Sequence, residues 1–174
     1  MSRFGVLLGF DESLARAQMA NLFEAMGSGC AVNRVVQVGR LTAAGRGTSG
    51  GIETDHPCSI AGHTLVGDVT LSGRERLRQR LDAGREASDH ELVLRAYLRW
   101  SDECVLHLEG DFAFVVSNGH DLFAARDALG VKPLYYAGHA DRLVVASEAE
   151  SVARVTRCGL NEQRIESTSG DPCH

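Results

Sequence analysis

The N-terminal third of the chain opens with an apolar run followed by a helical repeat. Residues 2–10 are apolar and β-capable and predict a buried first strand. Asp11 and Ser13 can then cap a helix that runs to about Gly27. The apolar face of this helix would consist of Ala15, Met19, Leu22, Phe23 and Met26. The pattern predicts a strand that leads directly into an amphipathic helix.

The next segment changes character at Gly39. Residues 31–38 predict a second strand. Gly39–Pro57 is rich in glycine and small polar residues, which favours a long loop over a regular element. Long loops in compact domains are often functional.

Two serine-led motifs predict helix starts in the middle of the chain. Ser72-x-x-Glu75 and Ser88-x-x-Glu91 both match the capping box, in which the two side chains satisfy each other's free backbone N–H groups. The second motif is followed at helical spacing by Val93, Ala96, Tyr97 and Trp100. We therefore expect two helices, the second with an apolar face that packs on a sheet.

From Phe112 onward the pattern indicates paired strands. Phe112–Ser117 and Leu122–Arg126 flank Asn118-Gly119, a tight-hairpin signal because these two residues accept positive φ. Leu134–Ala137 and Leu143–Ser147 form a second candidate pair. The first strand is apolar on both faces, so both faces of its sheet should be covered. The predicted core of this region is Phe112, Phe114, Val116, Leu122, Phe123, Val144 and Val145.

Helices and antiparallel strands within 174 residues indicate one α+β domain, and 44% hydrophobic with 24% charged residues is ordinary for a soluble domain. The net charge of -5, with scattered Lys and Arg, gives no reason to expect nucleic acid or a membrane as partner. No apolar run approaches the roughly 20 residues that cross a bilayer, and no signal peptide is evident, so we expect a cytoplasmic protein. Five widely spaced cysteines predict reduced thiols, and no motif predicts a metal site.

Residues 124–136 read AARDALGVKPLYY, and this stretch carries a family resemblance. Together with Gly110–Phe114, Ala146–Glu148 and Ser88–Glu91, which fall in the matching order and spacing, it resembles the N-terminal glutamine amidotransferase domain of asparagine synthetases. The resemblance implies a four-layer αββα sandwich of the N-terminal-nucleophile hydrolase type. It also implies an amidotransferase-like domain over 1–157 and a truncated linker over 158–174, which would lead towards an absent synthetase domain.

The resemblance places a nucleophile directly after the initiator methionine, where the family has cysteine and this chain has Ser2. A free α-amino group with a pKa near 8 would be its general base. Ser2 is therefore either a serine nucleophile or simply a small residue at the terminus. An unactivated serine is a much poorer nucleophile than a thiol near neutral pH.

The family's oxyanion hole, an asparagine side chain and the next glycine N–H, matches Val66-Gly67. Gly67 keeps the backbone donor or serves as a strand-end turn, whereas Val66 has no donor. Loss of one such donor costs on the order of 10²–10³ in rate in other acyl-transfer enzymes. Asp89 matches the aspartate that grips the α-amino group of glutamine, or it is a first-turn carboxylate at a helix N-terminus. Arg46 is the nearest candidate to hold the substrate carboxylate, or it is a solvated loop arginine.

Two further motifs resemble functional sequences. Ser49-Gly50-Gly51-Ile52 looks like the start of a pyrophosphate loop, but that loop should follow a buried strand, and Glu53 stands where an aspartate is needed. We therefore expect no cofactor in this chain, with ATP and Mg²⁺ confined to the synthetase domain. Arg126-Asp127 is expected to fix strand-to-loop geometry through a charge-assisted pair.

Two functions from different classes follow from the resemblance. In the first, the domain is degenerate and acts as a scaffold for a synthetase-type domain or chain, as in the similar β-lactam synthetases and lasso-peptide cyclases, which use an internal amine. In the second, it is an active glutaminase that supplies ammonia to asparagine synthesis. Ser2 and Val66 favour the first. The synthetase part is either a separate chain or lost through truncation of the reading frame.

Overall fold

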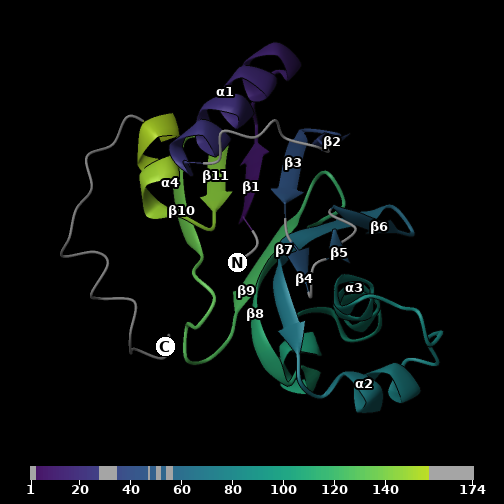
Figure 1. Cartoon of the computed structure of the whole chain (residues 1–174). Helices are drawn as coiled ribbons and strands as arrows, with labels where there is room; N and C mark the ends of the chain where they lie inside the picture. The colour runs from purple at the N-terminus through teal and green to yellow at the C-terminus, as the bar shows by residue number, and fades with distance from the viewer. Residues whose placement is uncertain (1–2, 28–34, 47, 50–51, 54–56, 157–174) are drawn as a thin grey trace, which may run out of the picture.

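The computed structural model describes residues 3–27, 35–46, 48–49, 52–53 and 57–156, and it is an αββα sandwich. Two antiparallel sheets pack face to face, and helices cover their two outer faces (Figure 1). Ser2, residues 31–34 and the predicted linker 158–174 lie outside the described residues. The predicted α+β class and layer order are confirmed.

The first sheet has five strands in the order β10-β11-β1-β3-β2. Their bounds are β1 Arg3–Leu8, β2 Val35–Val38, β3 Leu41–Arg46, β10 Tyr135–His139 and β11 Arg142–Ala146. Helices α1 (Glu12–Ala25) and α4 (Ala149–Thr156) lie over its outer face (Figure 1). The Asp11 carboxylate accepts a hydrogen bond from Leu14 N at 2.9 Å and caps α1 as predicted.

The second sheet has four strands in the order β6-β7-β8-β9. Their bounds are β6 Cys58–Ile60, β7 His63–Leu71, β8 Gly110–Ser117 and β9 Leu122–Arg126. Its outer face carries α2 (Arg74–Arg80), α3 (Asp89–Trp100) and the 3-10 helix η1 (Ser101–His107). Two short strands, β4 (Thr48–Ser49) and β5 (Ile52–Glu53), form a separate pair.

Three apolar layers hold the sandwich together. Phe4, Val6 and Val115 lie in the layer between the sheets, with Val66 and Val145. One outer layer packs under α1 and α4, and the other packs under α3. Of the predicted core residues, Phe112, Phe114, Val116, Val144 and Val145 are buried, whereas Leu122 and Phe123 are half-buried. Alternate residues of β8 face α3 and the first sheet, which confirms that this strand is covered on both sides.

The predicted loop Gly39–Pro57 is wrong over its first part. Leu41–Arg46 forms β3, which pairs with β1 on one edge and with β2 on the other. Ala43 packs between the sheets, and Ala44 packs on the α1 side. Small residues suggested a loop, but here they fit a strand that packs closely against the second sheet on one face and against α1 on the other.

The capping box predicted at Ser72 is also wrong. Helix α2 begins at Arg74 after Gly73, with no side-chain hydrogen bond at the cap. Ser72 N instead donates to Glu109 O at 2.9 Å, and Glu75 pairs with Arg78. The backbone connection to the start of β8 therefore sets this helix start.

The predicted hairpin pairs β8 with β9, but its loop is longer than two residues. The ladder closes at Ser117 and Leu122, so the loop spans Asn118–Asp121. The Asn118 side chain accepts hydrogen bonds from His120 N and Asp121 N, and only Gly119 in this loop has positive φ. The second predicted pair is confirmed as β10 and β11.

Within the described residues, no helix is long and apolar enough to cross a membrane. No group of three or more His, Cys, Asp and Glu side chains in that part of the chain is placed to hold a metal ion.

Candidate functional site

Strand β7 carries the segment that the sequence singled out for an oxyanion hole. Val66 is 1% exposed and packs between the sheets in the same cluster as Phe4, two residues after Ser2. The next residue, Gly67, lies inside the strand opposite Phe114 and not at a strand end. Position 66 therefore presents a buried isopropyl group where the resemblance calls for a hydrogen-bond donor.

A side chain at position 67 has no space. A Cβ atom built on Gly67 would lie 2.4 Å from Ala113 O and 2.6 Å from Phe114 Cβ, well inside van der Waals contact. His90 of α3 lies against the same residue, and its Nε2 donates a hydrogen bond to Gly67 O at 3.2 Å. Glycine at this position thus allows the close approach of β7 and β8.

His90 is a buried residue that the sequence analysis did not identify. Burial lowers the pKa of the imidazole below its usual value and outweighs the opposing effects of the Gly67 hydrogen bond and of Asp89 and Asp68. The ring is therefore neutral and carries its proton on Nε2, because a carbonyl oxygen can only accept. A histidine at the second position of an amphipathic helix was the available signal.

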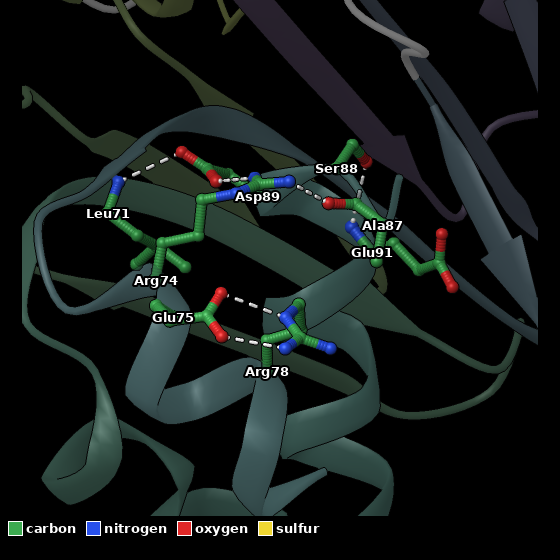
Figure 2. A network of polar contacts seen from close by, with 8 residues as sticks. All are labelled: Leu71, Arg74, Glu75, Arg78, Ala87, Ser88, Asp89 and Glu91. Carbon is green, nitrogen blue, oxygen red and sulfur yellow. Dashed lines mark hydrogen bonds and ion pairs between the residues drawn. The ribbon is translucent and has the colours of Figure 1, made fainter. Parts of the chain in front are cut away.

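Asp89 is the first residue of α3, and its carboxylate is bound within the chain. Ser88 caps the helix by accepting from Glu91 N at 3.2 Å, which is one half of the predicted capping box, whereas the Glu91 carboxylate binds Arg95 Nε. Asp89 Oδ2 accepts from Leu71 N at 3.0 Å, and Oδ1 binds Arg74 Nη1, which is shown in Figure 2. Arg74 also donates to Ala87 O. The carboxylate joins the end of β7 to the starts of α2 and α3, and its side chain is 21% exposed.

Arg46 ends β3, and its backbone lies opposite Arg3 in the antiparallel ladder. It is therefore beside the residue that directly follows Ser2. The structure thus brings the backbone of Arg46 and the side chain of Val66 towards the start of β1. Asp89 binds at Leu71, four residues beyond Gly67, or roughly 13 Å along an extended strand.

A buried ion pair lies close to Val66 and was not predicted. Lys132 Nζ is 3.1 Å from Asp68 Oδ2, and the two side chains are 14% and 8% exposed. Asp68 is two residues from Val66 on the same face of β7, which is the face between the sheets. A lone aspartate within an apolar strand was the signal in the sequence that could have revealed the pair.

Asp127 fixes the connection that carries Lys132. Its carboxylate accepts from Phe112 N at 3.3 Å, Val131 N at 2.9 Å and Lys132 N at 3.0 Å. Burial raises the pKa of this group, but the hydrogen bonds from Lys132, Val131 and Phe112 together lower it below its usual value. The predicted role in strand-to-loop geometry is therefore present, and it acts through backbone N–H groups.

The segment that resembles a pyrophosphate loop has the wrong surroundings for ATP. The expectation that no strand precedes it is wrong, because β3 does so. However, Thr48–Ser49 and Ile52–Glu53 pair as short antiparallel strands, and the next element along the described chain is strand β6. A pyrophosphate loop leads directly into a helix whose N-terminal N–H groups bind the phosphates, whereas the next described element here is a strand. The described elements around this segment are thus not those of a pyrophosphate loop.

Comparison with known proteins gives the family. The model of a glutamine amidotransferase domain matches residues 58–154, which is more than half of the chain. The chain belongs to this family of glutamine amidotransferase domains. The amidotransferase domain is 38% identical over 120 residues to asparagine synthetase [glutamine-hydrolyzing] 3 of Bacillus subtilis, a match that covers 60% of this chain and 20% of that protein. It is also 38% identical over 81 residues to asparagine synthetase [glutamine-hydrolyzing] 1 of the same organism, covering 45% and 13%.

Solved structures agree on the fold. The glutamine phosphoribosylpyrophosphate amidotransferase of B. subtilis superposes with a TM-score of 0.67 at 17% identity, covering 90% of this chain and 44% of that one. At this identity the likeness shows the fold alone. The chain thus has the fold of the N-terminal-nucleophile amidotransferases and is related to asparagine synthetases. It spans about a fifth or less of the length of these curated relatives.

Proposed function

We propose that this amidotransferase domain does not hydrolyse glutamine and serves as a scaffold for a synthetase-type domain that forms an amide bond. The observation that carries the proposal is Val66, which fills the donor position with a buried apolar side chain beside Phe4. An oxyanion that develops beside this side chain would find no hydrogen bond from it, and such a loss costs on the order of 10²–10³ in rate.

The residue at the nucleophile position supports the same proposal. Ser2 stands where a thiol enzyme of this kind would have cysteine. A serine hydroxyl needs a positioned base to attack an amide, whereas a thiol is partly ionised near neutral pH. Changes at the nucleophile and at the oxyanion donor act on the same chemical step, so together they would leave little turnover.

The state of Asp89 is a third support. Its carboxylate already binds the Arg74 guanidinium and Leu71 N, so a substrate ammonium would have to compete with an internal cation. A carboxylate whose two oxygens bind an arginine and a backbone N–H stabilises the local fold and does not need a ligand. We propose that Asp89 now has this structural role, and that Gly67 and Arg46 likewise do not bind glutamine.

The relatives support the partner. The curated relatives named above are longer proteins, of which this chain covers 20% and 13%. We propose that a synthetase-type domain, on this chain or on another, supplies the ATP and Mg²⁺ chemistry of an amide-forming ligase. An internal amine in place of ammonia would make glutamine hydrolysis unnecessary in such a system.

The alternative is an active glutaminase with Ser2 as nucleophile, and the names of both B. subtilis relatives favour it. Covalent labelling separates the two. The protein is incubated with a glutamine analogue that carries an electrophilic diazoketone, and its intact mass is measured. The scaffold role predicts no adduct, whereas a stoichiometric adduct that disappears in Ser2→Ala would establish a functional nucleophile.

A further inference from the structure

Large apolar side chains are exposed where the two sheets are joined at one edge of the molecule. Leu129 is 89% exposed and Val131 is 47% exposed in the connection between β9 and β10, and Tyr136 on β10 is 71% exposed. β9 and β10 are the end strands of their sheets among the described strands, and Figure 1 shows the connection running between them. Three of the six exposed large hydrophobic residues in the described chain thus lie within eight positions.

The sandwich is open along this edge. Tyr136 pairs with Val145, and Ala124 pairs with Val115, so both residues face the layer between the sheets. Both are nevertheless exposed. In each sheet the inner face therefore continues past the part that the opposite sheet covers. We call the exposed residues Leu129, Val131 and Tyr136 the edge surface.

The connection is held rigidly, so the exposed leucine is presented in a fixed position. The Asp127 carboxylate accepts from Val131 N and Lys132 N, and Gly130 N donates to Asp127 O at 3.0 Å. The Lys132 side chain is tied to Asp68 inside the sandwich. A preordered apolar anchor loses little conformational entropy on binding, which is the property of an interface hot spot and not of a solvated turn.

We propose that the edge surface is the docking site for the synthetase-type domain. This inference rests on the proposed function, from which the partner is taken. The relatives support this occupant because this chain covers only 20% and 13% of their lengths. The rest of each relative is therefore a large neighbour of its amidotransferase domain. Exposed apolar patches on a single domain mark such interaction sites.

The test uses the synthetase part of B. subtilis asparagine synthetase [glutamine-hydrolyzing] 3 as the probe, after circular dichroism has shown that this part is folded. Its dissociation constant is measured by calorimetry with the wild-type chain, with Leu129→Asp and with the matched control Leu106→Asp. Leu106 is 77% exposed on η1, in the helical layer on the far side of the second sheet. We expect Leu129→Asp to raise the dissociation constant at least tenfold and Leu106→Asp to change it less than twofold.

The outcomes separate this inference from the proposed function. Equal binding by the wild type and Leu129→Asp overturns the edge surface and leaves the partnership standing. Failure of the wild type to bind overturns both. Glutamine turnover by the wild type would refute the scaffold role and leave the docking surface intact. A wild-type dimer that Leu129→Asp converts to a monomer would mean that a second copy of the chain occupies the edge surface, and this would overturn the assignment. Urea unfolding is used to show that each variant is folded.

Discussion

The Asp127 carboxylate organises the connection between the sheets, so its replacement by an amide should be costly. In Asp127→Asn the side chain keeps its shape but loses its charge and one of its two acceptor oxygens. Oδ1 accepts from Val131 N, and Oδ2 accepts from Phe112 N and Lys132 N. Whichever way the amide is oriented, its NH₂ group faces at least one backbone N–H donor. The variant therefore leaves at least one donor without an acceptor in a buried site.

The magnitude follows from these bonds. A hydrogen bond to a charged group contributes about 1.5–3 kcal/mol, and a buried donor left unsatisfied costs about 1–3 kcal/mol. We expect the free energy of unfolding to fall by roughly 2–4 kcal/mol for Asp127→Asn, since the retained oxygen keeps part of the network. For a domain of this size that corresponds to a fall in Tm of roughly 5–15 °C.

The assay is urea unfolding followed by circular dichroism, with Asp141→Asn as the control. Asp141 pairs with Arg40 at the surface, and such exposed pairs contribute about 0–1 kcal/mol. The folded pKa of Asp127 lies below its unfolded value, so its contribution is complete above about pH 4 and is lost as the pH falls further. The wild type and Asp127→Asn should therefore have nearly equal free energies of unfolding in acid. An Asp127→Asn protein within 0.5 kcal/mol of wild type at pH 7 would refute this role.

Two further predictions concern β7 and its contact with α3. Gly67→Ala should lower the free energy of unfolding by about 2–3 kcal/mol, because the new Cβ overlaps backbone atoms of β8. In the control Gly84→Ala the new Cβ meets nothing within 4 Å, so this change should be near neutral. Equal effects of the two changes in urea unfolding would disprove the steric argument. The lowered pKa of His90 means that only the unfolded chain takes up a proton just below pH 6.5, so wild-type stability should fall as the pH drops from 6.5 to 5. In His90→Gln that slope should be shallower, and an unchanged slope would show that another group causes it.

Local sequence patterns predicted the elements whose apolar spacing is regular. Helix α1 with its Asp11 cap and the pairs β8–β9 and β10–β11 follow from periodicity and capping chemistry. Strand β3 could not be found in this way, because a strand of small residues is stabilised by pairing partners that lie far away in the sequence. Likewise, the start of α2 depends on a hydrogen bond from Ser72 to Glu109, which no local motif records.

The candidate site was predictable only in part. The family signature led to Gly67, Asp89 and the strand-to-loop role of Asp127, but not to what each side chain contacts. The ion pair between Asp68 and Lys132 joins residues 64 positions apart, and the sequence offers no rule that pairs them. Those contacts come from the way the two sheets pack, and this depends on the whole chain.

Glutamate release from glutamine is the measurement that tests the central claim most directly. The wild-type protein, with its initiator methionine removed, is assayed at saturating glutamine beside Ser2→Ala. We predict the same background rate for both, because serine stands at the position of the expected thiol and Val66 contributes no donor to an oxyanion. Turnover by the wild type well above that of Ser2→Ala would contradict the scaffold role and establish a serine-dependent amidotransferase.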